Sequence, residues 1–402
     1  MDDVDHLDHG WRTAGAWACY LGSSWTWVIG MFLPIILMRD FAWAGWLVFV
    51  LPNIFGAAVM GSVLRADSSC RLVARHRDMC LCFSEVTLAL HAFVLGWLYT
   101  RMFGTTVVVI ALFAAVLVQI AVHTRPKALT LGVWTTVISA ILLSLGLIFG
   151  WPDAFGIEPN QVSTDSGLDL WMFALASVVG FTLCPYLDLT FHRVRQATDP
   201  STGQRAFALG FIVIFLGMMI FSLAYASMLL PLFSRTIPQA DRPVIPTEWL
   251  SVLMIHLTLQ TAFTMGCHGR EIVLRRGGGA WLRVGLIVAV GLLAANLVGH
   301  GFDDLTNGYA TGETVFRIFL LAYGLAFPAY VFLCVIPLWR GGGNERDKVI
   351  VWALTTLVTC PMAYMGFVMS QSIWILVALA VLCAGRLALE LTRGKPLQKS
   401  AA

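Results

Sequence analysis

The chain has 402 residues, of which 58% are hydrophobic and only 12% are charged, and its formal net charge is +3. Soluble globular proteins carry roughly 25% charged residues, so this composition excludes a water-facing surface over such a length. The mean hydropathy is +0.79. The apolar runs do not alternate and are each about 20 residues long, which predicts membrane-spanning α-helices and excludes a β-barrel.

Twelve apolar runs are long enough to cross a bilayer. They cover residues 14–38, 41–64, 79–99, 104–123, 128–150, 168–191, 206–230, 249–269, 282–300, 314–338, 349–368 and 371–390. The segments between them are too short for a large soluble domain. We therefore expect an all-α polytopic integral membrane protein with about twelve transmembrane helices.

The cationic residues alternate between the two sides of this topology. If the N-terminus is cytoplasmic, 20 of the 26 lysine and arginine residues fall in cytoplasmic segments. Lysine and arginine are retained on the cytoplasmic side of membrane proteins. The pattern predicts cytoplasmic tails at residues 1–13 and 391–402, and the short loops favour a bacterial cytoplasmic (inner) membrane.

Several classes of site have no counterpart in the sequence. There is no P-loop, no glycine-rich dinucleotide turn after a strand and no zinc-type histidine pair, so no bound cofactor is expected. None of the nine cysteines lies in an external segment, so no disulfides are expected. The expected partners are a small-molecule solute and the lipid bilayer, with no nucleic acid, and the sequence does not give the oligomeric state.

Two predicted spans contain residues that interrupt a helix. Glycine and serine are poor in a helix interior, and proline removes a backbone donor. The residues concerned are Gly22, Ser23, Ser24 and Trp25 in the first span, and Gly180, Phe181, Thr182 and Pro185 in the sixth. An interruption frees backbone groups that can bind an ion or a polar solute beside a cavity. The alternative is a proline kink or a packing face of small residues.

The spacing of the two interruptions indicates a repeat. The sixth span comes five places after the first in the order of spans, so the two interrupted helices cross the membrane in opposite directions. Interrupted helices at equivalent positions of an inverted repeat are typical of secondary transporters.

With these two interrupted spans, the chain resembles the LeuT-type fold of the amino acid–polyamine–organocation superfamily, in particular the sodium/solute symporters. Their sixth core helix carries a Gln-Pro-His…Arg pattern, which Cys184-Pro185-Tyr186 and Arg193 resemble. The twelve spans, the basic loop after the second span and the long external loop after the seventh match as well. The resemblance implies a first five-helix repeat at 14–150, a second at 168–338 and two accessory helices at 349–390.

The chain departs from the sodium-coupled members of this superfamily in the eighth span. Those members have adjacent hydroxyl residues there, which complete a sodium site with carbonyls of helix one. Here Thr258, Thr261 and Thr264 are not adjacent to another hydroxyl residue. The additional span that often precedes the repeat in sodium/solute symporters is missing too. Both Na+ and H+ therefore stay open as the coupling ion.

Ionisable and polar residues inside a membrane are costly, and each is a candidate for function. His256, Gln260 and Thr264 follow one face of the eighth span. Interhelical hydrogen bonds are the alternative for this stripe, and pairing with a basic loop is the alternative for Glu85. The predicted substrate-binding residues are Ser23, Ser24, Trp25, His91, Gly180, Phe181, Thr182 and Gln260, and the predicted ion-coupling residues are Gly22, Thr261, Thr264 and Glu85.

These patterns predict a secondary active transporter rather than an enzyme. It would carry out cation-coupled symport of a small polar solute by alternating access. Two alternatives stay open. One is a membrane-embedded transferase that uses His91, His256 or Glu85 as a general base, and the other is a transporter-like scaffold or sensor. Continuous first and sixth helices would contradict the transporter prediction.

Overall fold

The computed structural model describes residues 10–150, 169–233, 244–299, 311–338 and 344–391. These residues form helices and contain no β-strand. Ten of the described helices are long and apolar enough to cross a membrane, and Thr105–Ala121 is a shorter apolar helix. The prediction of an all-α polytopic membrane protein is confirmed. Most of the two predicted tails, the external loop at 151–167 and the middle of the external loop at 231–248 lie outside the described residues.

The N-terminal part of the chain supplies the first five predicted spans. Its elements are α1 (Trp11–Trp25), α2 (Val28–Val63), α3 (Ala66–Arg75), α4 (Arg77–Val94), η1 (Leu95–Tyr99), α5 (Thr100–Phe103), α6 (Thr105–Ala121) and α7 (Arg125–Phe149). The backbone of Ala42 leaves the helical region, with φ 52° and ψ −147°. The long α2 therefore contains two helices, which are the second half of the first span and the whole of the second span.

The remaining described residues supply the other seven predicted spans. The sixth and seventh comprise α8 (Leu170–Leu183), η3 (Cys184–Leu187), α9 (Leu189–Ala197), α10 (Pro200–Leu209), η4 (Gly210–Phe215), α11 (Leu216–Leu229) and η5 (Leu230–Phe233). The eighth to twelfth comprise α12 (Thr247–Arg276), α13 (Ala280–Gly299), α14 (Thr311–Leu321), η7 (Ala322–Ala326), α15 (Phe327–Tyr330), η8 (Val331–Val335), α16 (Glu345–Ala363), η9 (Tyr364–Val368) and α17 (Ile373–Leu391). Each of the twelve predicted ranges thus coincides with helical structure.

The spans differ in how much of their surface the protein covers. On α6, large apolar side chains such as Phe113 and Ile110 are 64% and 55% exposed, as expected for a helix whose outer face meets lipid. On α1, by contrast, Trp17 and Tyr20 are fully buried. The first span therefore lies inside the bundle, where its interruption cannot open to lipid.

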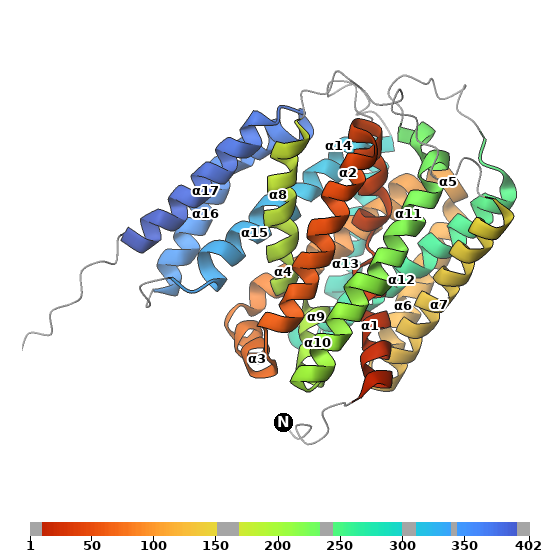
Figure 1. The fold of residues 1–402 in the computed structure, drawn as a ribbon, viewed down its shortest axis with the longest axis horizontal. Helices are drawn as coiled ribbons and strands as arrows, with labels where there is room; N and C mark the ends of the chain where they lie inside the picture. Colours follow the sequence, from red (N-terminus) through yellow and green to blue (C-terminus); the bar gives the residue numbers. More distant parts are fainter. Residues whose placement is uncertain (1–9, 151–168, 234–243, 300–310, 339–343, 392–402) are drawn as a thin grey trace, which may run out of the picture.

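The helix contacts have a regular pattern between the two halves of the chain. The first span packs on the seventh (α1 on α10), and the sixth packs on the second (α8 on α2). The third packs on the ninth (α4 on α13), and the eighth packs on the fourth (α12 on α6). If spans one to five are exchanged with spans six to ten, each of these contacts becomes another of them. The last two helices, α16 and α17, pack on each other at one edge of the bundle, far from α6 and α7 (Figure 1).

Candidate substrate and ion site

The first span is interrupted where α1 ends. Its last turn closes on Gly22, whose carbonyl oxygen accepts hydrogen bonds from the backbone nitrogen (3.0 Å) and the Oγ1 hydroxyl (2.7 Å) of Thr26. Thr26 and Trp27 then leave the helix before α2 begins at Val28. The Trp27 indole donates to the carbonyl oxygen of Ser24 at 2.5 Å. The predicted interruption is confirmed, and the helix stops just after the Gly-Ser-Ser sequence.

The sixth span is interrupted at its proline. The helix α8 ends at Leu183, and Cys184–Leu187 form a 3-10 turn that contains Pro185. Asp188 is extended and caps α9, because its Oδ1 atom accepts hydrogen bonds from the backbone nitrogen and the hydroxyl of Thr190, each at 2.7 Å. A capping aspartate satisfies an amide of the new helix. The interrupted sixth helix is therefore also confirmed.

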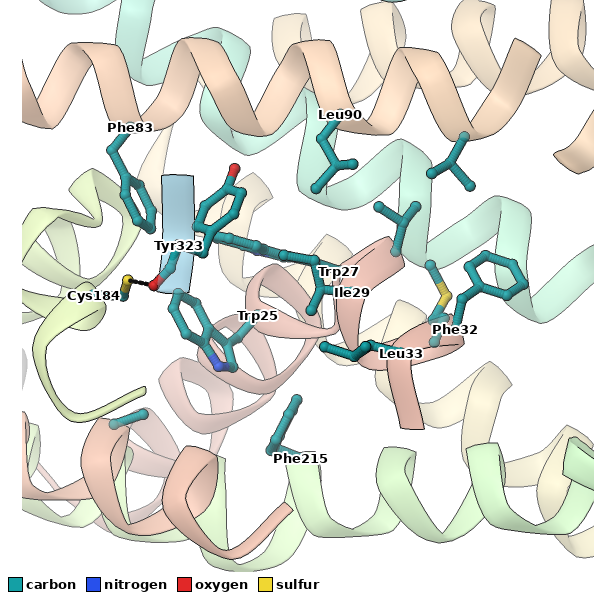
Figure 2. Close-up of a cluster of buried hydrophobic side chains, with 14 of the residues drawn as sticks. Trp25, Trp27, Ile29, Phe32, Leu33, Phe83, Leu90, Cys184, Phe215 and Tyr323 are labelled. Carbon is teal, nitrogen blue, oxygen red and sulfur yellow. Dashed lines mark hydrogen bonds between the residues drawn. The ribbon is translucent and has the colours of Figure 1, made fainter. Parts of the chain in front are cut away.

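The two interruptions meet inside the bundle. The hydroxyl groups of Ser24 and Thr190 lie 3.4 Å apart, and the ring centroids of Trp25 and Phe191 lie 4.8 Å apart. Figure 2 shows Trp25 and Trp27 directed toward the region of Cys184 and Tyr323, where the Cys184 thiol donates to the Tyr323 carbonyl oxygen at 3.1 Å. Three spans that are distant in sequence, the first, the sixth and the tenth, are thus joined at this point.

Two small cavities lie beside these interruptions. The first, of about 20 Å³, is lined by Trp25, Trp27, Ile29, Gly30, Asn53, Phe181, Cys184 and Tyr323. The second, of about 60 Å³, shares Ile29, Phe181 and Tyr323 with the first and extends to Ser177, Gly180 and Phe367. Since one water needs roughly 10–15 Å³, they hold about one water and a few waters respectively. A larger solute fits only if the surrounding helices move.

The cavity lining is aromatic, with one well-oriented polar group. The Trp25 indole donates to the side-chain carbonyl oxygen of Asn53 at 2.6 Å. Asn53 was not among the substrate-binding residues predicted from sequence, but the structure places it in the cavity wall. Indole faces bind apolar or cationic groups, and an amide orients a polar one.

Several of the predicted substrate-binding residues surround these cavities. Trp25 and Phe181 line the first cavity, and Gly180 and Phe181 line the second. His91 lies at the break, where its Nε2 atom is 3.4 Å from the backbone nitrogen of Val28. Ser24 lies at the contact between the two interruptions. Thr182 does not line either cavity.

A second group of predicted residues lies on the far side of α1. The Ser23 hydroxyl is 3.0 Å from that of Thr136, and its carbonyl oxygen accepts from Thr264 at 3.3 Å. The Gln260 side-chain amide donates to the Ser139 hydroxyl at 3.0 Å. The same hydroxyl lies 3.0 Å from the Nδ1 atom of His256. The polar stripe of α12 therefore contacts the fifth span and α1, and it does not border the tryptophan-lined cavity.

The other predicted ion-coupling residues lie apart from one another. Thr261 hydrogen-bonds the Tyr99 hydroxyl at 2.8 Å, and the Gly22 carbonyl oxygen is occupied by Thr26. Glu85 pairs with Arg283 at 2.7 Å and with Arg276 at 3.2 Å at one end of the bundle. Among the predicted ion-coupling residues, Thr264 therefore contacts the first interruption. Thr261 instead contacts Tyr99, and Glu85 lies at one end of the bundle.

A buried network of four charges lies at the end of the first span that is farther from α1. Arg39 forms a two-pronged pair with Glu313, at 2.7 and 2.9 Å, and bonds Asp40 at 2.8 Å. Arg317 completes the network by bonding Asp40 at 3.1 Å and Glu313 at 2.8 Å. The two cations and two anions balance, as buried charges require. The network joins the α2 part of the first span to the start of the tenth.

A smaller network lies beside the α9 half of the sixth span. Arg193 of α9 lies 3.6 Å from Glu271 of α12 and donates to the carbonyl oxygen of Val122 at 2.8 Å. Arg275 also pairs with Glu271, at 3.3 Å. These contacts join α9, α12 and the end of α6, on the other side of the cavities from Arg39.

Two buried groups near the break of the sixth span were not among the residues predicted from sequence. They are Asp188 and His268, both fully buried, with 3.9 Å between Oδ2 and Nε2. A signal was present for each of them. Asp188 follows the proline break directly, and His268 continues the stripe His256, Gln260 and Thr264 by one further turn.

Comparison with known proteins gives no assignment for this arrangement. No protein-family model matches the chain, and no curated protein matches it.

Proposed function

We propose that this protein is a cation-coupled secondary active transporter that moves a small solute by alternating access, with Na+ or H+ as the coupling ion. The strongest support for a transporter is that the first and sixth spans are both interrupted and meet beside a cavity. Interrupted helices inside a bundle offer backbone groups to a solute without exposing them to lipid.

The closures at the two ends support alternation. A transporter needs one barrier on each side of its site, and the barriers must be able to open separately. The Arg39–Glu313 network joins the first and tenth spans, whereas the Arg193–Glu271 pair joins the sixth and eighth. Because the two barriers share no residue, one can break while the other holds. The small cavities correspond to a state in which both are closed.

The contact pattern supports a LeuT-type arrangement. Contacts that are preserved when the two halves are exchanged are expected for two five-helix repeats of opposite orientation, at 14–150 and 168–338. The helices α16 and α17, packed on each other at the edge, match two accessory helices (Figure 1). In this proposal the helices around the two interruptions rock against the others.

The ends of the bundle support the proposed orientation in a bacterial inner membrane. The Arg75–Glu345 pair joins the basic loop after the second span to the start of α16, and Glu85 joins α4 to Arg283. Basic segments that the topology assigns to the cytoplasm therefore lie together. Both termini belong on this side.

Neither alternative function gains a specific observation. A transferase would need His91, His256 or Glu85 as a general base in a polar cluster open to lipid, but both histidines are fully buried and Glu85 pairs with Arg283 and Arg276. A scaffold without transport would have a dry apolar centre, whereas Asp188 and His268 are buried next to the interruptions.

The test begins with thermal-shift measurements against amino acids, sugars, nucleobases and osmolytes, with Na+, K+ and pH varied. A solute that binds the folded state stabilises it by mass action. Each stabilising solute is then tested for counterflow into proteoliposomes. We expect counterflow that Phe181→Ala abolishes. A solute that stabilises the protein without counterflow, or that is converted into a product, would overturn the proposal.

A further inference from the structure

We propose that Asp188 and His268 form a proton-binding site that couples proton movement to the opening of the cavity, an inference that rests on the proposed function and deepens it. Asp188 begins α9 after the break of the sixth span, and His268 lies on α12. Their Oδ2 and Nε2 atoms are 3.9 Å apart, and both side chains are fully buried. They are the only such pair at either interruption among the described residues.

Asp188 is satisfied on one side only. Its Oδ1 atom accepts two hydrogen bonds from Thr190, while its buried Oδ2 atom has no hydrogen-bond partner. A buried carboxylate without a partner is strongly unfavourable, because burial removes its hydration and nothing replaces it. The free oxygen therefore needs either a positive partner or a proton.

His268 presents the matching atom. Its Nδ1 atom lies 3.1 Å from the Ser84 hydroxyl, whereas its buried Nε2 atom has no hydrogen-bond partner and faces Asp188. The imidazole ring packs against Trp27, with ring centroids 5.4 Å apart. The pair thus lies between the break of the sixth span and the residue that ends the break of the first.

The charged residues around Asp188 and His268 are paired with one another. A charge on either member of the pair must therefore be compensated by the other member. The nearest acid, Glu271, is engaged by Arg193 at 3.6 Å and by Arg275 at 3.3 Å. Within the described part of the chain, no lysine or arginine forms an ion pair with Asp188. The other titratable groups that interact with the pair or its neighbours are Tyr20, Cys80, His91, Cys184, His192, Cys267 and Tyr323.

One proton satisfies both atoms. Taken from water at one side of the membrane, it binds His268 Nε2, and the imidazolium donates to Asp188 Oδ2 at about 2.8 Å. The pair is then neutral overall and suits the closed cavity. When the proton returns to water at the other side, a lone buried carboxylate remains and favours hydration of the site. Imidazole nitrogen is a poor ligand for hard cations, which prefer oxygen, so a proton fits better than Na+.

Cys184 reports on this opening without a known solute, because it lines the cavity four residues before Asp188. The experiment measures alkylation of Cys184 by a maleimide in the purified full-length protein, from about pH 5.5 to about pH 8.5, by peptide mass spectrometry. Wild type and Asp188→Asn are compared at each pH. A negative charge on Asp188 disfavours the neighbouring Cys184 thiolate, so this direct effect would lower the labelling ratio at high pH and cannot imitate the rise that opening of the cavity produces. The asparagine keeps the cap of α9 and removes only the charge.

We expect the ratio of wild-type to Asp188→Asn labelling to rise several-fold with pH. Asp199→Asn is the matched control. Asp199 caps α10 through Ser201 and Thr202 as Asp188 caps α9, but at the cytoplasmic end of the bundle. Although desolvation raises the pKa of Asp199, hydrogen bonds from Thr202 and Ser201 lower it below its usual range, so the carboxylate stays charged throughout. Asp199→Asn should follow the wild type.

A second variant, His268→Gln, keeps the test decisive if Asp188→Asn does not fold. It removes the protonatable nitrogen and should flatten the pH response. Equal pH dependence in wild type and in either variant would overturn the proton site. So would labelling that follows Na+ at constant pH. Failure of the proposed function is distinguishable, since it would appear as absent counterflow of every solute while the pH response of Cys184 persists.

Discussion

At the scale of single residues, two acids in apolar segments have opposite surroundings. Glu85 reaches two arginines at the end of the bundle, with Nε–Oε1 distances of 2.7 Å to Arg283 and 3.2 Å to Arg276. Among the described residues, no arginine pairs with Asp188, which is fully buried. Of the two acids only Glu85 was a candidate from sequence, because it lies in an apolar run, and Arg283, which pairs with it, is nearly 200 residues away along the chain. No local pattern contains that information.

Removing one acid from each type of ion pair should have very different effects on stability. Glu313→Gln leaves the buried Arg39 and Arg317 without full compensation and should lower the free energy of unfolding by about 3–5 kcal/mol. Glu85→Gln breaks pairs with half-exposed arginines and should lower it by at most about 1 kcal/mol. Denaturation of both variants in the same detergent checks this order. A larger loss for Glu85→Gln would contradict the buried network.

At the scale of elements, the corner between the first and second spans carries backbone strain. Ala42 has φ 52° and ψ −147°, a region that only glycine occupies without cost. Ala42→Gly should therefore raise the free energy of unfolding by about 1 kcal/mol, the relieved strain being partly offset by chain entropy. The control is Ala44→Gly, two residues further in the same element, which should lower it by about 1 kcal/mol. Thermal denaturation distinguishes the two signs, and destabilisation by both changes would contradict the strained corner.

The second span approaches the sixth most closely at a glycine. A Cβ atom at Gly56 would lie 2.4 Å from the Phe181 carbonyl oxygen, which is backbone and cannot move aside. Gly56→Ala should push the broken helix away, destabilise the protein and abolish counterflow. Gly217→Ala is the control, since a Cβ atom there meets nothing within 4 Å. That change should be neutral or stabilise by up to about 1 kcal/mol. Equal behaviour of the two variants would rule out the close approach.

The positions of the helix breaks could be predicted, but their exact ends could not. Glycine, serine and proline are unfavourable wherever they occur in a helix, so their presence alone marks both spans. In the structure, however, Gly22 and Ser24 remain helical, and the chain leaves the helix only at Thr26. The reason is that the Thr26 hydroxyl and the Trp27 indole bond the last carbonyls of α1. These side-chain bonds depend on packing that the sequence does not display.

At the scale of the whole molecule, the two halves make corresponding contacts although their residues differ. The second span packs on the sixth through Gly56, and the first packs on the seventh through Gly22 and Gly210. Apolar runs and charge asymmetry were enough to predict twelve spans and their order. They could not predict which spans touch, because lipid-facing and protein-facing surfaces are both apolar. Trp25, Gly180 and Phe181 of the cavity lining could be predicted from the interruptions, but the contributions of Asn53 and Tyr323 depend on which spans touch and could not be predicted.

At this scale, the proposed mechanism requires that two separate barriers, the Arg39–Glu313 network and the Arg193–Glu271 pair, control access to one site. The most direct test places Arg39→Gln and Glu271→Gln in proteoliposomes and measures labelling of Cys184 by an impermeant maleimide added to one side or the other, read by peptide mass spectrometry. Exposed Cys70 on α3 serves as the reference for the side of the membrane on which α3 lies. We expect Arg39→Gln to open Cys184 to the side opposite Cys70, and Glu271→Gln to open it to the side of Cys70. Labelling of Cys184 from the same side in both variants, or from neither side, would contradict alternating access.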